Sequence, residues 1–209
     1  MSANQIKTEY VISFSDALFA FAITLMALTI EIPNFPNNIT ESELTKRLGE
    51  TLIPNIVHYI ISFLVIGMYW IAYHRFFEYI KRIDITFLWL NLIFLFFISL
   101  VAYFTGLLAT YDTYRIVVMS FASVLSAAGF TICIMTWYAT HNRKLVDKDL
   151  DAHLIRFFLL RSLVSPLIFL SSIGISFIDI QGANYFWTAM IPVYAIINKI
   201  HKPYLSKLK

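Results

Sequence analysis

Six apolar runs, each long enough to cross a lipid bilayer, dominate this sequence and restrict its fold more than any other feature. They occupy 11–32, 52–77, 83–108, 116–139, 154–178 and 183–197, the last being short and interrupted by Pro192. About 20 helical residues cross a hydrocarbon core of about 30 Å. Because 59% of the residues are hydrophobic and only 14% are charged, an ordinary soluble domain is excluded. We therefore expect an all-α membrane protein with six transmembrane helices in a single domain, 1–209.

The basic residues between the runs predict the orientation of the chain. Only Lys46, Arg47 and Arg115 fall on one side of the membrane, and the other Lys and Arg residues fall on the opposite side. Since cytoplasmic loops carry the excess of Lys and Arg, both termini are predicted to be cytoplasmic. The first run lacks a cleavage site and is expected to remain in the mature protein. Segment 42–48 is expected to form a short surface helix, with Pro54 in the first turn of the second span.

The first run carries a carboxylate, Asp16, near its cytoplasmic end. A charged residue in hydrocarbon costs about 2.5–3.5 kcal/mol on insertion scales, so it needs a partner or a function. Ser15 and Asp16 are expected at the same depth as His74 and Arg75 of the second run, where these groups form an interhelical polar cluster. Trp70, one turn before His74, is expected to cover that cluster. The competing interpretation is that Arg75 snorkels and His74 faces water.

The first run also has a nearly apolar face. Residues at spacings of three and four share one side of a helix, and here they are Ala17, Phe21, Thr24, Leu28 and Glu31. Two interpretations remain open at this point. The face is either a packing stripe inside a helix bundle, or one wall of a pore in which apolar side chains form a constriction and Thr24 offers an oxygen to an ion.

Several motifs that would indicate other functions are missing from the sequence. It contains no carbonyl-type potassium filter, Gly-rich phosphate loop, zinc-protease motif or nucleophile elbow. The single cysteine, Cys133, lies within an apolar run and allows neither a disulfide nor a thiolate metal site. His58 and Asn91 are expected to make interhelical hydrogen bonds rather than to act in catalysis. We therefore expect no enzyme activity, no cofactor, no bound metal and no nucleic-acid partner.

The first run resembles a known family at its most distinctive point. Phe14, Ser15 and Asp16 precede an apolar helix that contains Thr24 and Leu25 and is closed by Pro33. This pattern is similar to that of the transmembrane protein 175 family, the endosomal and lysosomal potassium channel and its prokaryotic relatives. The resemblance implies a multi-pass protein of the cell membrane. Its six-helix subunits would form a homotetramer around a central pore lined by the first helix, and the pore would conduct potassium without a carbonyl filter.

The resemblance also implies roles for individual residues. The family's apolar constriction residue falls on Phe21, its pore-facing threonine on Thr24, and further apolar layers on Leu25 and Leu28. Ser15 and Asp16 match the polar pair of the signature that begins at Phe14, which ties the first helix to its neighbours. Many members have Arg four residues before the signature Phe, where this chain has Tyr10. His74 or Arg75 is expected to replace that Arg as the partner of Asp16.

Two functions follow as hypotheses. The first is a potassium-preferring cation channel, with a hydrophobic constriction formed by the first helix. The alternative is a proton- or cation-coupled secondary transporter that uses Asp16 and His74 as a relay.

Overall fold

The computed structural model describes residues 7–30 and 39–205, and in these ranges nearly all of the chain is helical. The helices are α1 (Thr8–Leu28), α2 (Glu41–Phe77), α3 (Ile85–Tyr111), α4 (Arg115–Thr140), α5 (Ala152–Ile175), α6 (Ile180–Phe186) and α7 (Met190–Leu205). Two short 3₁₀ turns, η1 (His141–Arg143) and η2 (Trp187–Ala189), follow α4 and α6. The all-α fold class is confirmed.

Five of these helices, α1 to α5, are long and apolar enough to cross a membrane. The sixth apolar run is helical as well, but it is divided into α6, η2 and α7. Pro192 is the third residue of α7. A proline in the first helical turn gives up no hydrogen bond, whereas it would disrupt a helix that continued through it. The predicted end of the first run, with Glu31, Ile32 and Pro33, lies outside the described residues.

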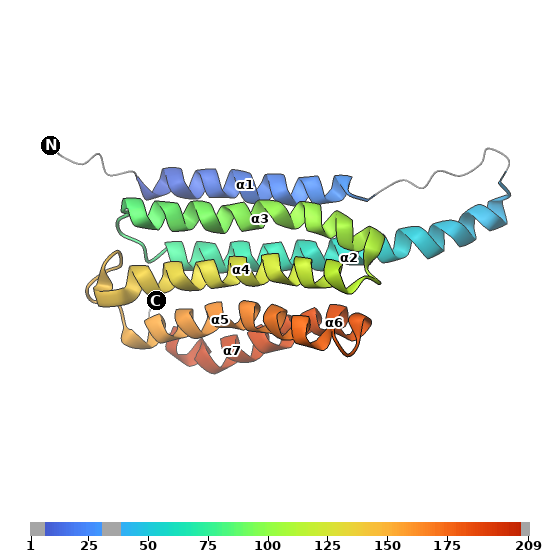
Figure 1. The fold of residues 1–209 in the computed structure, drawn as a ribbon. Helices are drawn as coiled ribbons and strands as arrows, with labels where there is room; N and C mark the ends of the chain where they lie inside the picture. Colours follow the sequence, from blue (N-terminus) through green and yellow to red (C-terminus); the bar gives the residue numbers. More distant parts are fainter. Residues whose placement is uncertain (1–6, 31–38, 206–209) are drawn as a thin grey trace.

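The second helix differs from its prediction. The segment 42–48 is not a separate surface helix, because α2 runs without a break from Glu41 to Phe77 over 37 residues. Thr40 caps its start by accepting a hydrogen bond from the backbone N–H of Glu43. Pro54 consequently lies in the interior of α2 instead of its first turn. The first part of α2 projects beyond the ends of α3 and α4 (Figure 1).

The helices lie side by side along a common direction (Figure 1). α1 packs on α2 and α3, and α4 packs between α3 and α5. α6 and α7 pack on α5. α1 therefore covers one side of the bundle and the α6–α7 segment covers another. α7 ends at the end of the bundle where α1 begins (Figure 1).

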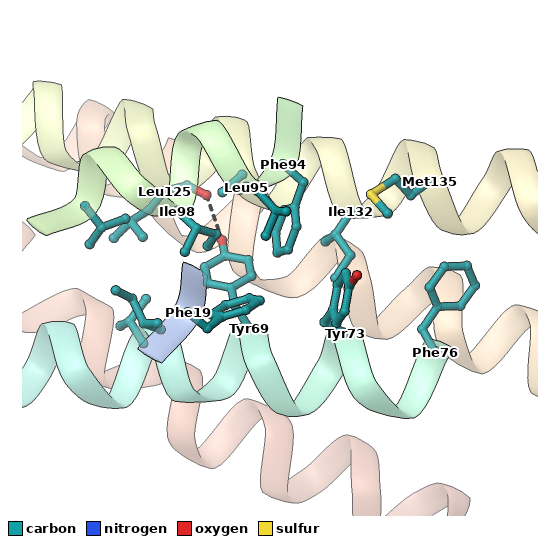
Figure 2. Close-up of a cluster of buried hydrophobic side chains, with 14 of the residues drawn as sticks. Phe19, Tyr69, Tyr73, Phe76, Phe94, Leu95, Ile98, Leu125, Ile132 and Met135 are labelled. Carbon is teal, nitrogen blue, oxygen red and sulfur yellow. Dashed lines mark hydrogen bonds between the residues drawn. The ribbon is translucent and has the colours of Figure 1, made fainter. Parts of the chain in front are cut away.

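Aromatic rings from α1, α2 and α3 form the core beneath α1 (Figure 2). The ring centroids of Phe19, Tyr73 and Phe94 lie 5.8 to 5.9 Å apart, within the range of favourable ring contacts. Tyr69, one turn before Tyr73, donates its hydroxyl proton to the backbone carbonyl of Leu125 on α4 at 2.7 Å. Contacts between aromatic rings thus stabilise this core, and the buried hydroxyl group of Tyr69 has a hydrogen-bond partner.

α4 and α5 approach each other closely at Gly129. A Cβ atom added there would lie 2.6 Å from Cδ of Pro166 and 2.9 Å from the hydroxyl of Tyr69. Ser126, one turn earlier on α4, donates its hydroxyl proton to the backbone carbonyl of Pro166 at 3.2 Å. Small residues on α4 therefore permit the contact with the proline-containing part of α5.

Hydrogen bonds and an ion pair of Asp84 join the start of α3 to the end of α4 and to the loop that follows α4. Asp84 caps α3 by accepting from the backbone N–H of Phe87 at 2.9 Å. Its other carboxylate oxygen accepts from the Tyr138 hydroxyl at 2.8 Å and lies 3.1 Å from Nζ of Lys144. Partial burial opposes ionisation, but these hydrogen bonds outweigh it and hold the pKa of Asp84 below its ordinary value. Hydrogen bonds to Tyr138 and Asp84 raise the pKa of Lys144.

Asp84→Asn is expected to lower the thermal stability of the protein at neutral pH, by about 0.2–1 kcal/mol, because it removes the ion pair but keeps a capping oxygen. A carboxyl group with a lowered folded pKa stabilises the fold above its unfolded pKa and loses that contribution as the pH falls through the folded value. The difference in melting temperature between wild type and variant should therefore begin to shrink near the unfolded pKa of about 3.9 and vanish only when the pH lies below the lower folded pKa of Asp84. Asp149→Asn, an exposed carboxylate in the 141–151 loop, is the control. A difference that persists in acid would contradict the assignment.

Candidate functional site

α1 has two apolar faces with different surroundings. One face is buried against α2 and α3, and its members are Val11, Ser15, Phe19, Ala22 and Met26. Phe19 is 1% exposed and Met26 is fully buried. This face provides the contacts that hold α1 on its own subunit.

The opposite face of α1 is the stripe identified in the sequence, and it points away from the rest of the subunit. Phe21 is 64% exposed, Leu25 36% and Leu28 79%, and Thr24 is exposed as well. The interpretation of this face as a packing stripe within one subunit is therefore wrong, because the subunit's own helices do not cover it. Large apolar side chains gathered on one uncovered face mark a surface for lipid or for another protein chain.

Thr24 places a hydroxyl group between Phe21 and Leu28 on this outward face. Its proton is used within the helix, where Oγ1 donates to the carbonyl of Ala20 at 2.6 Å and lies 3.1 Å from that of Phe21. A threonine hydroxyl has one proton and two lone pairs, so its lone pairs remain available. Between the apolar side chains of Phe21 and Leu28, the Thr24 oxygen can thus accept a hydrogen bond, while its own proton is already used within the helix.

The structure brings Asp16, Trp70 and His74 together at one end of α1 and α2. Oδ1 of Asp16 accepts from the indole N–H of Trp70 at 2.9 Å, and Nε2 of His74 lies 2.6 Å from the same oxygen. Nε2 therefore carries the imidazole proton when Asp16 is ionised. The Trp70 and His74 rings also contact each other, with centroids 4.6 Å apart. Trp70 does more than cover the cluster, because it donates a hydrogen bond to the carboxylate.

Ser15 is the centre of a second, fully buried network. Its hydroxyl donates to the carbonyl of Val11 at 2.8 Å and lies 2.7 Å from the hydroxyl of Tyr73. Nδ2 of Asn91 on α3 donates to the same oxygen at 3.3 Å. One proton and two lone pairs of Ser15 are thus all used. The expected interhelical role of Asn91 is confirmed.

Tyr73 was not among the residues selected from the sequence. Nothing distinguishes one tyrosine among the many aromatic residues of the second run. Its position one residue before His74 and four after Tyr69 would have placed it on the inner face of α2, had the buried side of that helix been known.

Arg75 does not belong to the cluster, contrary to expectation. Its side chain is exposed, and no ion pair links it to Asp16 among residues 7–30 and 39–205. Successive residues point about 100° apart around a helix, so Arg75 cannot share the face on which His74 meets Asp16. His74 alone takes the place of the expected basic partner.

Phe14 and Tyr10 lie outside the hydrogen-bonded cluster. Both are more than half exposed, and with Trp89 of α3 they line a shallow apolar hollow of about 280 Å³ between α1 and α3. The aromatic residue of the Phe14-Ser15-Asp16 sequence therefore faces outward, while the two polar residues bind neighbouring helices.

Comparison with known proteins places this arrangement in a family. A model described as the endosomal/lysosomal potassium channel TMEM175 matches residues 10–101, which include α2 and most of α1 and α3. A potassium channel of Streptomyces collinus is 30% identical over 171 residues, which make up 80% of this chain and 81% of that relative. The chain belongs to the TMEM175 family.

A solved structure of the TMEM175 family has the same fold. The crystal structure described as a lysosomal potassium-selective channel TMEM175 homolog from Chamaesiphon minutus matches with a TM-score of 0.78 and 25% identity. The match covers 90% of this chain and 96% of that one. The rat endosomal/lysosomal proton channel TMEM175 is 26% identical over 145 residues, which are 69% of this chain but only 28% of the rat protein.

These relatives of the TMEM175 family are ion channels and not enzymes. With five helices apolar enough to cross a membrane, this member is a multi-pass membrane protein. The resemblance noted at Phe14-Ser15-Asp16 is thus confirmed for the family and the fold.

Proposed function

We propose that this chain is a potassium-preferring cation channel whose pore is walled by the outward face of α1 from four copies. The observation that carries the proposal is the uncovered apolar stripe of Phe21, Leu25 and Leu28 around the hydroxyl of Thr24. The names of the relatives support potassium as the conducted ion, because the Streptomyces protein is named a potassium channel and the Chamaesiphon structure is described as potassium-selective.

The chemistry of the stripe suits a gate without a carbonyl filter. Apolar side chains from several copies that meet at an axis exclude water, and a dry constriction blocks ions until it widens. An ion that passes must shed part of its hydration shell, which potassium does at lower cost than sodium. Thr24 offers lone pairs that replace part of the lost water. Phe21 and Leu28 supply the narrow layers, and Thr24 lies between them.

The network around Ser15 and Asp16 has a supporting role in this proposal. It fastens the cytoplasmic end of α1 to α2 and α3, so the outward stripe keeps a fixed orientation. The distribution of Lys and Arg supports cytoplasmic termini and insertion into the cell membrane.

The test is an ion-flux assay on purified protein in liposomes. We expect uptake of potassium to exceed that of sodium under matched gradients, and native mass spectrometry of the detergent-solubilised protein to give the mass of four chains. Empty liposomes and liposomes with heat-unfolded protein are the controls. Absence of flux above these controls, or a stable dimer that conducts, would overturn the proposal.

A second candidate has one specific observation in its favour. The 2.6 Å contact between Asp16 and His74 joins two groups that can exchange a proton, and the rat relative is named a proton channel. A proton- or cation-coupled transporter that uses this pair would show slow turnover without unitary currents, and its reversal potential would depend on pH. Single-channel recordings with a reversal potential set by potassium alone would exclude this mechanism.

A further inference from the structure

Ser13 extends the outward stripe of α1 by one turn toward the cytoplasmic end. It precedes Ala17 by four residues and Thr24 by eleven. At about 3.6 residues per turn, eleven residues make about three turns with about 20° left over, so Ser13 and Thr24 point in nearly the same direction. The stripe therefore begins at its cytoplasmic end with a second hydroxyl group.

Ser13 and Ser15 face opposite sides of α1. Two residues along a helix are about 200° apart, and the structure agrees, because Ser15 is fully buried whereas Ser13 is exposed. α1 packs on α2 and α3 and forms one edge of the bundle (Figure 1). The Ser13 side of α1 is therefore turned toward the surroundings of the subunit, as the Thr24 side is.

The hydroxyl of Ser13 is not used within the subunit. In residues 7–30 and 39–205 it forms no hydrogen bond, whereas the hydroxyl of Thr24 donates its proton to the carbonyl of Ala20. Ser13 thus keeps one proton and two lone pairs for water or an ion. The exposed hydroxyl of Ser123 on α4 is equally uncommitted in the described part of the chain. What distinguishes Ser13 is its position in line with the proposed pore wall.

A carboxylate lies beside Ser13 on the same helix. Asp16 follows by three residues, about 60° around the helix, and its side chain is 39% exposed. Its Oδ1 atom makes the interhelical hydrogen bonds described above, and its Oδ2 atom makes none within the described ranges. The exposed Lys7 and Glu9 near the start of α1 carry opposite charges. A cation is therefore favoured over an anion near Ser13.

On the basis of the proposed four-chain pore, we infer that Ser13 forms a second hydroxyl layer at the cytoplasmic entrance and binds hydrated potassium ions there. Its oxygen and proton form hydrogen bonds with the water molecules around the ion. Ala17, one turn further, has a small side chain, so this part of the stripe leaves room for water. Thr24 lies about 16 Å beyond Ser13 along the helix, between large apolar side chains, where the ion has lost part of its water.

The first test measures potassium flux into liposomes at increasing potassium concentration. Ser13→Ala should raise the concentration at half-maximal flux by about twofold to tenfold, the range that follows from the net strength of one hydrogen bond. Ser13→Thr keeps a hydroxyl group and should remain close to wild type. Ser123→Ala removes an equally exposed and uncommitted hydroxyl from α4, which packs between α3 and α5, and should have no effect.

The second test detects water at Ser13 without measuring flux. In a chain that carries Cys133→Ala, the Ser13→Cys variant is embedded in nanodiscs and treated with a methanethiosulfonate reagent that bears a trimethylammonium group. Intact mass spectrometry then follows the gain in mass. Ile134→Cys on α4 is the control, because its side chain is 50% exposed on a helix separated from α1 by α3. We expect Ser13→Cys to react much faster than Ile134→Cys.

The control has nearly the same depth in the membrane. Ser15 is linked to Asn91, seven residues after Asp84 on α3, and Asp84 is linked to Tyr138 on α4. With a rise of about 1.5 Å per residue, Ser13 and Ile134 both lie about 6–8 Å from the level of Asp84. A difference in reactivity therefore reports the side of the helix and not its depth.

The inference is overturned if Ser13→Ala has the same half-maximal concentration as wild type, or if Ser13→Cys reacts no faster than Ile134→Cys. With wild-type flux intact, either result rejects the Ser13 layer and leaves the proposed channel standing. Absence of flux in wild type instead rejects the channel and this site with it. Thermal unfolding of each variant shows whether it is folded.

Discussion

Phe21→Ala is expected to raise potassium flux through the reconstituted protein and to reduce its preference for potassium over sodium. The ring is 64% exposed on the outward face of α1, so its removal widens and wets the proposed constriction without opening a cavity in the subunit. A barrier lowered by about 1.4 kcal/mol corresponds to about a tenfold rise in rate, and we expect a change of this order. Leu28→Ala, at the most exposed position of the stripe, should act in the same direction.

Phe19→Ala is the matched control for this experiment. It removes the same side chain two residues earlier on the same helix, but Phe19 is 1% exposed and packs against Tyr73 and Phe94. We expect it to reduce the free energy of unfolding by about 3–5 kcal/mol, the usual cost of emptying an aromatic core position. Liposome flux and thermal unfolding are measured for both variants. If Phe21→Ala leaves conductance and ion preference unchanged, the assignment of the pore wall is wrong.

Ser15→Ala is expected to destabilise the subunit strongly while leaving its ion preference unchanged. The substitution removes the acceptor for the buried hydroxyl of Tyr73 and for the amide of Asn91. Each buried group left without a partner costs about 1–3 kcal/mol. Thermal unfolding in detergent measures the loss, and the ratio of potassium to sodium flux at a permissive temperature tests the selectivity.

Ser13→Ala, at an exposed position two residues away, is the control for stability and should leave the unfolding temperature unchanged. Asp16→Asn should have a smaller effect than Ser15→Ala, because the carboxylate is partly exposed and its amide replacement still accepts from Trp70. If Ser15→Ala is as stable as wild type but conducts sodium and potassium equally, the residue acts on the ion and not as an anchor.

The sequence was sufficient to predict helices, the approximate limits of most of them and the members of the outward face of α1. The spacing of three and four residues separates Phe21, Thr24 and Leu28 from Phe19 and Met26 without any coordinates. The spacing does not show which of the two faces is covered by other helices. Both faces are apolar, and apolar side chains are as suitable for contact with lipid as for a protein core. Only the packing of α1 on α2 and α3 decides that the Phe19 face is inside.

Three details could not be predicted for physical reasons. Arg75 follows His74 in the chain, yet neighbouring residues of a helix point in different directions. Tyr73 is one aromatic residue among many, and its role depends on its contact with Ser15 on another helix. The continuous α2 was divided in the prediction because proline usually marks a helix start, whereas here Pro54 is tolerated in the interior.

The length of α2 has an electrical consequence. His58 lies level with Asp112 after the end of α3, and Glu41 precedes His58 by 17 residues, about 25 Å of helix. The charged residues at the tip of α2, which include the ion pair of Glu43 and Arg47, therefore stand about two to three Debye lengths from that end of the bundle at physiological ionic strength. Their field is screened from ions approaching the bundle in physiological salt, and it reaches them only in dilute solution, where the Debye length grows to about 30 Å.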